Sequence, residues 1–324
     1  MPLQNLLEHR RSVRHYADTP IDPETVRRCL KTAQLAPSSS NMQLYEFYHI
    51  TDPAVLKRLA EACFNQQAAA TAQQMVVFVT RQDLFAERAR AVLEFERGNI
   101  RRNSPPEKHA KRIAASEGYY GKLMPFLYAR CFGLIGGLRW LISRSIGLFR
   151  PMQREVTEAD VRTVVHKSCA LAAQTFMLAM AENGLDTCPM EGLDSRRVKR
   201  ILNLPRGAQI NMIAACGIRK QGHGIWGERF RLPFDEVYRR LCRVCGASHA
   251  RGFGGCARGG GCVIRQRLRQ VRHGRGRSGI YARRFDICRL PSGMNARPTR
   301  LRERERPSEN GFSDGLLPRL LPYK

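Results

Sequence analysis

Residues 10–43, RRSVRHYADTPIDPETVRRCLKTAQLAPSSSNMQ, decide the fold because they place two short polar clusters on either side of one helix. The first cluster, residues 10–14 (RRSVR), gathers three guanidinium groups around a hydroxyl, which suits a phosphate or another polyanion. The second, residues 36–43 (APSSSNMQ), is a turn whose side chains both donate and accept hydrogen bonds. Residues 21–33 between them predict an amphipathic helix with Asp22 as N-cap. The two clusters together suit a ligand with a charged end and a polar heterocyclic end.

In this order and spacing, the pattern Arg-Arg-Ser-x-Arg followed by Ala-Pro-Ser-Ser-x-Asn-x-Gln resembles the nitroreductase family of FMN-dependent oxidoreductases. Two later segments add to the resemblance, residues 188–192 (CPMEG) and residues 229–233 (RFRLP). The resemblance spans roughly residues 3–241, with a variable stretch at 97–158 that implies a lid or insertion over the flavin. One departure is visible at Leu44-Tyr45, where the family often has Pro followed by an aromatic residue.

The resemblance implies an FMN site built from residues that lie far apart in the sequence. Arg10, Arg229 and Arg231 would hold the flavin phosphate, and an extended chain would point the last two to one side. Arg14 would lie at the pyrimidine edge, where a cation stabilises the anionic reduced flavin. The cofactor-binding residues expected from the resemblance are Arg10, Arg11, Ser12, Arg14, Pro37, Ser38, Ser39, Asn41, Gln43, Asn65, Pro189, Met190, Glu191, Gly192, Arg229 and Arg231. No side chain is assigned a catalytic role, because the flavin carries the chemistry.

The function implied by the resemblance is hydride transfer from NADPH or NADH, through flavin N5, to a nitroaromatic, quinone or similar small-molecule acceptor by a ping-pong mechanism. The family also implies an intertwined homodimer with FMN between the subunits. Two alternatives stay open. One is a flavin enzyme of the same fold that dehalogenates its substrate or fragments the flavin. The other is a basic protein that binds nucleic acid or a membrane surface.

The order of the predicted elements indicates the fold class. Strands are expected at 46–51, 75–80 and 209–217, and the apolar run at 75–80 is typical of a buried central strand. Helices are expected at 2–8, 21–33, 54–72, 82–96, 168–183, 194–202 and 234–241, and a basic loop at 97–108. Because strands and helices alternate without a regular βαβ repeat and no GxGxxG fingerprint follows a strand, the chain is α+β. The resemblance makes it a three-layer α-β-α sandwich with a mixed or antiparallel sheet.

Residues 119–149 are the most hydrophobic part of the chain. A membrane-spanning helix needs about 20 mostly apolar residues, and Arg130, Arg139 and Arg144 interrupt this run. We therefore expect either a lid over the substrate pocket, in which Tyr119, Tyr120, Phe126 and Trp140 supply stacking surfaces, or a hairpin in weak contact with a membrane surface.

Length and charge divide the chain. Its 324 residues exceed the ~100–200 of a usual domain, so residues 1–242 are expected as the FMN-binding domain and 243–324 as an appendage. The net charge is +27, and the appendage carries 18 Arg and one Lys against five acidic residues. We predict a disordered tail or an out-of-frame product of GC-rich DNA. The alternatives are a small unrecognised domain and a basic arm for nucleic acid or acidic lipid. The tail's aromatic residues are sparse for base stacking, which disfavours nucleic acid.

The compartment is inferred from the N-terminus and the cysteines. Residues 1–11 (MPLQNLLEHRR) hold no apolar secretory segment. The 11 cysteines lack the paired spacing of a zinc site, so reduced thiols, no metal and a cytoplasmic location are expected.

Overall fold

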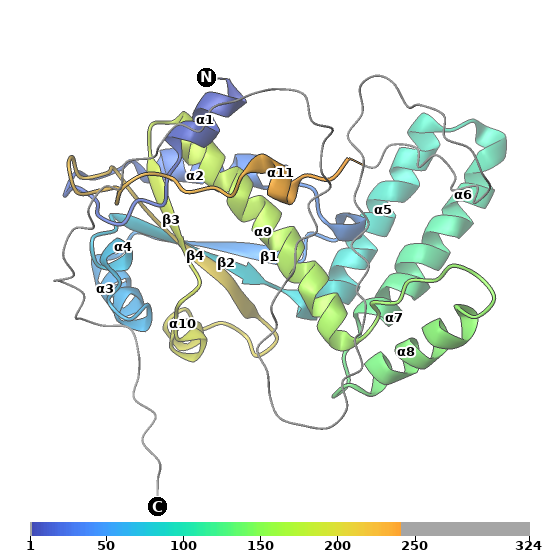
Figure 1. Ribbon diagram of the computed structural model, residues 1–324. Helices are drawn as coiled ribbons and strands as arrows, with labels where there is room; N and C mark the ends of the chain where they lie inside the picture. The colour runs from blue at the N-terminus through green and yellow to red at the C-terminus, as the bar shows by residue number, and fades with distance from the viewer. Residues whose placement is uncertain (1, 241–324) are drawn as a thin grey trace, which may run out of the picture. The chain divides into compact units, whose positions relative to one another are not determined.

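A four-stranded antiparallel sheet forms the centre of the computed structural model, which describes residues 2–240 (Figure 1). The strands lie in the order β1-β2-β4-β3, and each pairs with its neighbours in the antiparallel sense. Their bounds are β1 Tyr45–Ile50, β2 Gln74–Thr80, β3 Asp186–Met190 and β4 Gln209–Gly217. The sheet confirms the α+β class and is antiparallel, not mixed.

Strand β2 is buried on both faces, as its continuous apolar sequence predicts. Met75, Val77 and Val79 pack against the helical layer of α3, α4 and α10. Val76 and Phe78 point the other way and pack against α2 and α9. The bounds of these helices are α2 Pro23–Ala33, α3 Pro53–Ala62, α4 Gln67–Ala70, α9 Glu158–Glu182 and α10 Ser195–Ile201. The result is the three-layer α-β-α sandwich expected from the sequence.

Helix α9 crosses the sheet with 25 residues and is longer than its sequence prediction. It begins at a capping box, in which the Thr157 hydroxyl accepts from the Asp160 N–H and the Asp160 carboxylate accepts from the Thr157 N–H. The helix predicted over 168–183 therefore starts ten residues earlier, at Glu158.

The prediction of one continuous helix over 54–72 is wrong, because the chain breaks between two separate helices there. Helix α3 ends at Ala62, because Phe64 and Asn65 adopt left-handed backbone angles with φ of +58° and +50°. Only the short helix α4 follows the break, and the turn between the two helices becomes part of the candidate site.

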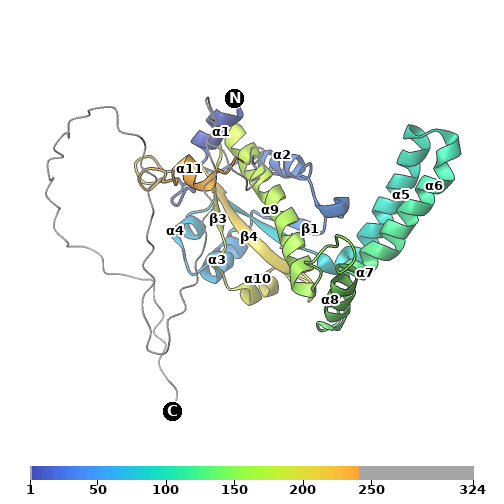
Figure 2. The ribbon, with the colours of Figure 1, turned by 45° about the vertical axis from the view of Figure 1, so that its right-hand side comes forward.

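The variable region 97–158 is mostly helical. Helix α5 runs to Asn103 through the stretch predicted as a loop at 97–108, since no proline occurs between its first residue, Phe85, and Pro105. Figure 2 shows α5 and α6 side by side, directed away from the sheet. The bounds here are α5 Phe85–Asn103, α6 His109–Ser116, a π-helical segment Glu117–Leu123, α7 Met124–Tyr128 and α8 Leu134–Ile146. The other helical segments of residues 2–232 are α1 Leu3–His9 and single 3-10 turns at Ser39–Asn41, Gln82–Leu84 and Pro106–Lys108.

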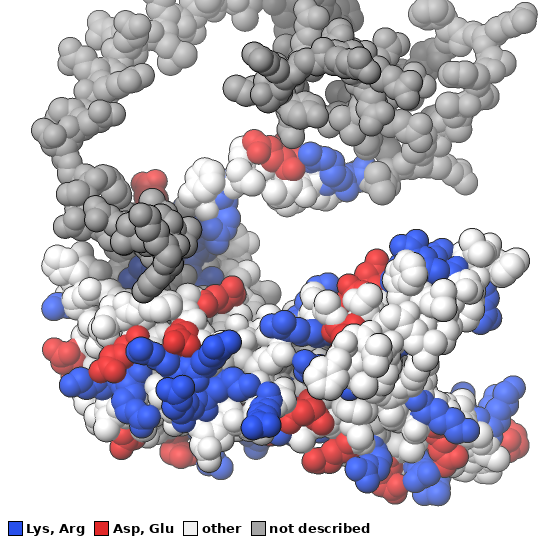
Figure 3. Space-filling model, turned by 90° about the horizontal axis from the view of Figure 1, so that it is seen from below, with Lys and Arg blue, Asp and Glu red and all other residues white. Residues whose placement is uncertain are grey.

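One described helix, α9, has the length and hydropathy of a membrane-spanning segment, and 56% of the window concerned is buried inside the fold. The hydrophobic stretch 119–149 contains helix α8, whose 13 residues are fewer than the about 20 that a membrane-spanning helix needs. In Figure 3, seen from below, the right-hand part of the molecule shows a broad area of uncharged side chains with basic and acidic side chains around it.

Residues 233–240 belong to a second unit, in which α11 spans Phe234–Val237. This helix is shorter than the 234–241 predicted for it. The expectations for the tail, 243–324, concern residues outside the described part of the chain.

Replacing Phe176 by Ala should lower the free energy of unfolding by about 3–5 kcal/mol, because the fully buried ring joins α9 to Phe78 on the sheet. Urea titration followed by circular dichroism measures this change. The matched control is Phe95→Ala in α5, where the ring is 58% exposed and a change within about 0.5 kcal/mol is expected. Equal effects of the two substitutions would contradict the described packing of α9.

Glu158 predicts a pH-dependent contribution to stability. The Cys131 N–H donates to its Oε1 at 2.9 Å, and this bond lowers the pKa of Glu158 below its ordinary value of 4.5. A lowered pKa means that the contribution is present above pH 4.5 and is lost as the pH falls through the folded-state value. The free energy of unfolding of wild type should therefore exceed that of Glu158→Gln at about pH 7, and this difference should shrink as the pH is lowered below 4.5. A constant difference in the urea midpoint would contradict the assignment.

Candidate flavin site

The first polar cluster lies in an extended segment beside β3. Ser12 forms a parallel bridge with Thr187, and the Val13 N–H donates to the Thr187 carbonyl at 3.2 Å. Val13 is fully buried, so the alternation of an extended chain turns Arg10, Ser12 and Arg14 to the other side. Ser12 and Arg14 are exposed, and Arg10 is half-buried.

Arg10 stands in a region of uncompensated positive charge. Partial burial and the positive charges of Arg229 and Arg231 lower the pKa of Arg10. Its Nε is buried without a hydrogen-bond partner, and its Nη1 lies 3.9 Å from the Met177 Sδ, a weak acceptor. No carboxylate within residues 2–240 forms an ion pair with Arg10. The donors and the charge fit a bound anion.

Arg229 and Arg231 make different contacts, a difference that the sequence did not indicate. Arg229 donates to the carbonyls at the C-terminal end of α1, to Leu7 at 2.7 Å and also to Arg10. It therefore positions the backbone of Arg10. Arg231 is exposed and donates to the Phe230 carbonyl at 2.7 Å. Arg11 donates to the Gly227 carbonyl at 2.9 Å.

The segment after β3 lies beside the left-handed turn that ends α3. The Gln66 Nε2 donates to the Gly192 carbonyl at 2.7 Å, which brings the neighbouring Asn65 close to this segment. Of the other predicted residues here, Pro189 and Met190 pair with β4, and Glu191 is exposed. Gln66 was missed by the sequence reasoning, and only its position next to Asn65 hints at a role.

The first cluster and β3 come together in space. Burial raises the pKa of the Cys188 thiol, and the positive charges of Arg14 and Arg10 act against that rise. Residues 10–14, 188–192 and 65–66, with Arg229 and Arg231, therefore form one group of predicted residues, which we call the arginine site.

The second cluster, residues 37–43, forms a separate group, which we call the serine turn. Pro37 opens it and is exposed. The Gln43 N–H donates to the Ser38 Oγ at 3.3 Å, and the Gln43 Nε2 donates to the Asn41 Oδ1 at 3.2 Å. These bonds hold an irregular backbone, in which Ser40, Asn41 and Gln43 have φ of +50°, +52° and +46°.

Two tyrosines of the variable region contact the serine turn. The hydroxyls of Tyr119 and Ser40 lie 2.8 Å apart, and the Tyr120 hydroxyl donates to the Ser40 carbonyl at 3.2 Å. The sequence predicted stacking surfaces for these tyrosines, whereas the described contacts are hydrogen bonds and one edge-on pair between the two rings.

Helix α9 separates the two groups. The Ser39 N–H of the serine turn donates to the Ser168 Oγ at 3.1 Å, whereas Arg10 of the arginine site contacts Met177. These positions are nine residues apart, which is about 13 Å along the axis and half a turn around it. One chain therefore holds the two groups on opposite faces of the same helix.

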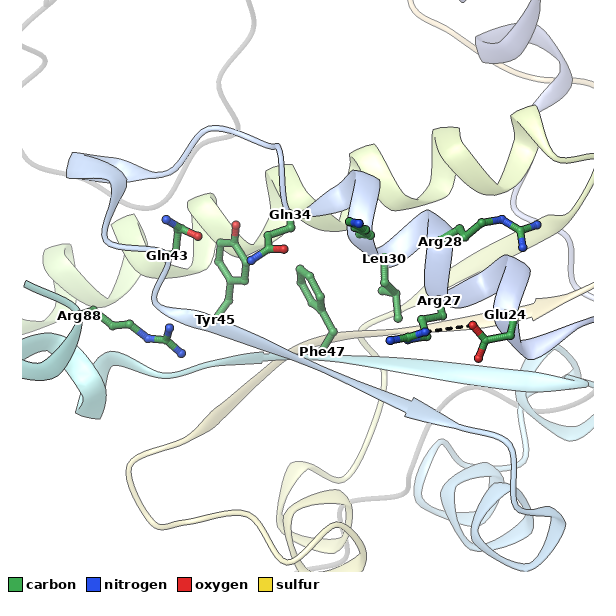
Figure 4. Close-up of a pocket in the computed structure, with 10 residues that line it drawn as sticks. Glu24, Arg27, Arg28, Leu30, Gln34, Gln43, Tyr45, Phe47 and Arg88 are labelled. Carbon is green, nitrogen blue, oxygen red and sulfur yellow. Dashed lines mark hydrogen bonds and ion pairs between the residues drawn. The ribbon is translucent and has the colours of Figure 1, made fainter. Parts of the chain in front are cut away.

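A cavity of about 620 Å³ lies between α2 and β1, with Arg88 of α5 at one end (Figure 4). Its floor is formed by Tyr45 and Phe47, whose rings stack at 5.2 Å. Gln43 is the one predicted cofactor residue that lines it, so this cavity is distinct from the arginine site. Leu44 and Tyr45, the departure from the family pattern, are buried in the core.

The sequence pattern of the nitroreductase family matches residues 7–218. The chain therefore belongs to the nitroreductase family, which confirms the resemblance of its motifs, and it is an oxidoreductase. A curated relative, the NADH dehydrogenase of Thermus thermophilus, is 26% identical over 230 residues, 70% of this chain and 90% of that protein.

A second relative matches a shorter segment. The 5,6-dimethylbenzimidazole synthase of Rhodospirillum rubrum is 40% identical over 84 residues, 26% of this chain and 38% of that enzyme. Among solved structures, a nitroreductase-type protein of Exiguobacterium sibiricum in complex with FMN superposes with a TM-score of 0.53 at 18% identity, covering 74% of this chain and 98% of that one. At 18% identity, the similarity of the two structures shows that they share the fold.

Proposed function

We propose that this chain is an FMN-dependent oxidoreductase that moves hydride from NADPH or NADH to a small-molecule acceptor such as a nitroaromatic or a quinone. The observation that carries the proposal is the half-buried Arg10, which stands beside two further arginines without a carboxylate. The FMN complex of the Exiguobacterium protein and the name of the Thermus relative support the cofactor and the donor.

The arginine site fits an FMN phosphate. A phosphate would supply the acceptor that the Arg10 Nε lacks and would relieve the repulsion among Arg10, Arg229 and Arg231. Asn65 and residues 189–192 would lie along the ring, and Arg14 would hold positive charge near its pyrimidine edge. When bound, FMN would supply the redox chemistry, uptake of a hydride from the nicotinamide and reduction of the acceptor. The protein's task is to fix the ring and to leave one face open to each substrate in turn.

We further propose that a second copy of the chain completes each site, as a homodimer. The serine turn contacts α9 nine residues away from the contact of the arginine site, at Ser168 and not at Met177. A partner's serine turn would therefore supply Ser38, Ser39 and Asn41 for the ribityl hydroxyls. A solvent-facing stripe of α9 that includes Leu171, 48% exposed, offers a surface for the partner.

The first test is the visible spectrum of the purified full chain before and after anaerobic NADPH or NADH. A flavin spectrum that bleaches supports the redox function, and bleaching by one donor alone identifies that donor. A folded, colourless protein that added FMN does not restore would refute it and favour the basic binding protein left open by the sequence.

Replacing Arg10 by Ala should weaken FMN binding about 10- to 100-fold, because a charge-assisted hydrogen bond to the phosphate contributes about 1.5–3 kcal/mol. Riboflavin lacks the phosphate, so its affinity should change little. Flavin fluorescence titration measures both. Arg28→Ala, an exposed arginine on α2, is the matched control and should bind both flavins like wild type. An equal loss for FMN and riboflavin would show that Arg10 does not contact the phosphate.

Mixing two variants that each impair flavin binding tests the shared site. Arg10→Ala impairs the arginine site, and Ser39→Trp blocks the exposed side of the serine turn. If each site combines both chains, a mixed dimer holds one site with both defects and one intact site, so random mixing restores about a quarter of the sites. Co-expression with two different affinity tags, followed by flavin content, measures this. No rescue in the purified mixed dimer would place both groups of each site in one chain.

A second candidate activity uses the flavin itself as substrate. The local identity to the Rhodospirillum synthase favours it, since dimethylbenzimidazole carries two methyl groups on a benzo ring, as the flavin does. Repeated reduction and reoxidation in air distinguishes the two. Full recovery of the flavin spectrum supports the proposed oxidoreductase, whereas irreversible loss of FMN supports conversion of the flavin.

A further inference from the structure

Helix α8 turns its apolar face away from the protein. Its buried positions are Gly136, Arg139 and Ser143, which share one face because they are three and four residues apart. Leu134, Leu138 and Leu141 lie on the opposite face and are 73%, 51% and 57% exposed. This is the reverse of a surface helix in a soluble domain, which buries its apolar stripe.

Specific bonds of the buried face hold the helix in this orientation. The buried Arg139 guanidinium donates to the carbonyls of Val156 at 2.8 Å, Phe126 at 2.9 Å and Ala129 at 3.1 Å. Gly136 lies so close to α9 that a Cβ there would be 2.9 Å from the Glu158 backbone nitrogen. A roll of α8 that buried its leucines would expose a hydrogen-bonded charge and break this contact, so the exposure is built into the fold.

The apolar surface continues past both ends of the helix. Phe132 precedes it and Leu148 and Phe149 follow it, all three with most of their surface exposed. Trp140 is on its flank, with the Arg144 guanidinium 5.4 Å from the ring centroid. Figure 3 shows the resulting area of uncharged side chains. Single exposed apolar residues are common on proteins, but a contiguous group of this kind marks an interaction surface.

The segment that carries this surface has an excess of positive charge, and the acidic residues Glu155 and Glu158 follow it in the sequence. Residues 118–154 contain no Asp or Glu and six basic residues. Five of these, all but Arg139, are exposed, namely Lys122, Arg130, Arg144, Arg150 and Arg154. An apolar face bordered by arginines, with Trp at the flank, complements a lipid surface with anionic headgroups.

We propose that α8 and its flanking residues 132–149 dock this protein on anionic lipid bilayers. A helix of 13 residues is about 20 Å long, shorter than the ~30 Å hydrocarbon core, so it lies in the plane of the interface and does not span it. The leucines and Phe132, Leu148 and Phe149 enter the boundary of headgroups and acyl chains, and the arginines meet the lipid phosphates. The proposal is independent of the flavin chemistry.

A second copy of the chain is the competing occupant of this face. If two α8 faces met about a twofold axis, two segments with six positive charges and no negative charge would oppose each other. Like charges at that distance disfavour the contact, whereas anionic headgroups neutralise them. The charge therefore selects lipid over a second copy.

The test uses the full chain with Trp226→Phe, which leaves Trp140 as the one tryptophan. The probes are vesicles of phosphatidylcholine alone and with about 30% phosphatidylglycerol. Anionic vesicles should shift the Trp140 emission to shorter wavelength and sediment the protein. Leu138→Glu with Leu141→Glu should reduce vesicle partition roughly tenfold or more and abolish the shift, because both side chains leave water on docking. Leu3→Glu in α1, an equally exposed leucine, is the control and should behave as wild type.

The experiment must also separate α8 from the basic tail, because the 18 arginines of the tail attract anionic vesicles on their own. The tail holds no tryptophan, so the emission of Trp140 reports α8 alone. At about 0.5 M salt, attraction through exposed charges is screened while inserted apolar side chains stay bound. The shift should therefore persist once docking has occurred.

Three outcomes overturn the proposal. The first is no emission shift with either vesicle, and the second is an unchanged shift in the double variant, provided that circular dichroism shows it folded. The third is a change of mass by light scattering in the double variant without lipid, combined with unchanged vesicle binding at about 0.5 M salt, where the tail's charges are screened. That result would assign the face to a contact between copies of this chain.

Discussion

The packing of α9 across the sheet is the constraint on which the rest of the structure depends. Its inner face is closed by Phe176 and small residues against β2 and β4, which leaves no freedom to shift the helix. Both groups of predicted cofactor residues contact this helix, at Ser168 and at Met177. The relation between the two groups is therefore a property of one rigid helix, and so is the need for a partner that we infer from it.

The sequence predicted the parts of the fold that depend on local pattern. It predicted strand β2 from its apolar run and the start of α2 from the N-cap Asp22. Burial on both faces requires apolar residues, and an N-cap requires a short polar side chain, so both features can be recognised in the sequence. The break at Phe64 and Asn65 was not predicted, since no glycine marks the left-handed turn. The early start of α9 was missed because its capping box stands among polar residues.

The sequence proposed the members of the candidate site but not their arrangement. The order of the motifs pointed to Arg10 and the serine turn, whereas the carbonyl contacts of Arg229 and the bond from Gln66 to Gly192 join residues more than 100 positions apart. Such contacts leave no periodic signal in one chain. The sequence also did not predict that the apolar face of α8 is exposed. Hydrophobic residues in a helix usually indicate burial, whereas here the hydrogen bonds of Arg139 determine which face is buried.

The serine turn has a consequence for the kinetics of association. Ser40, Asn41 and Gln43 all occupy left-handed backbone conformations, and each such non-glycine residue costs of order 1 kcal/mol. Hydrogen bonds to Ser38, Ser168 and the two tyrosines stabilise this strained backbone in the ligand-free chain. The entropy of ordering the turn is thus lost on folding. At the proposed site a ligand would therefore meet a preorganised surface, and its on-rate would be limited by encounter and not by loop closure.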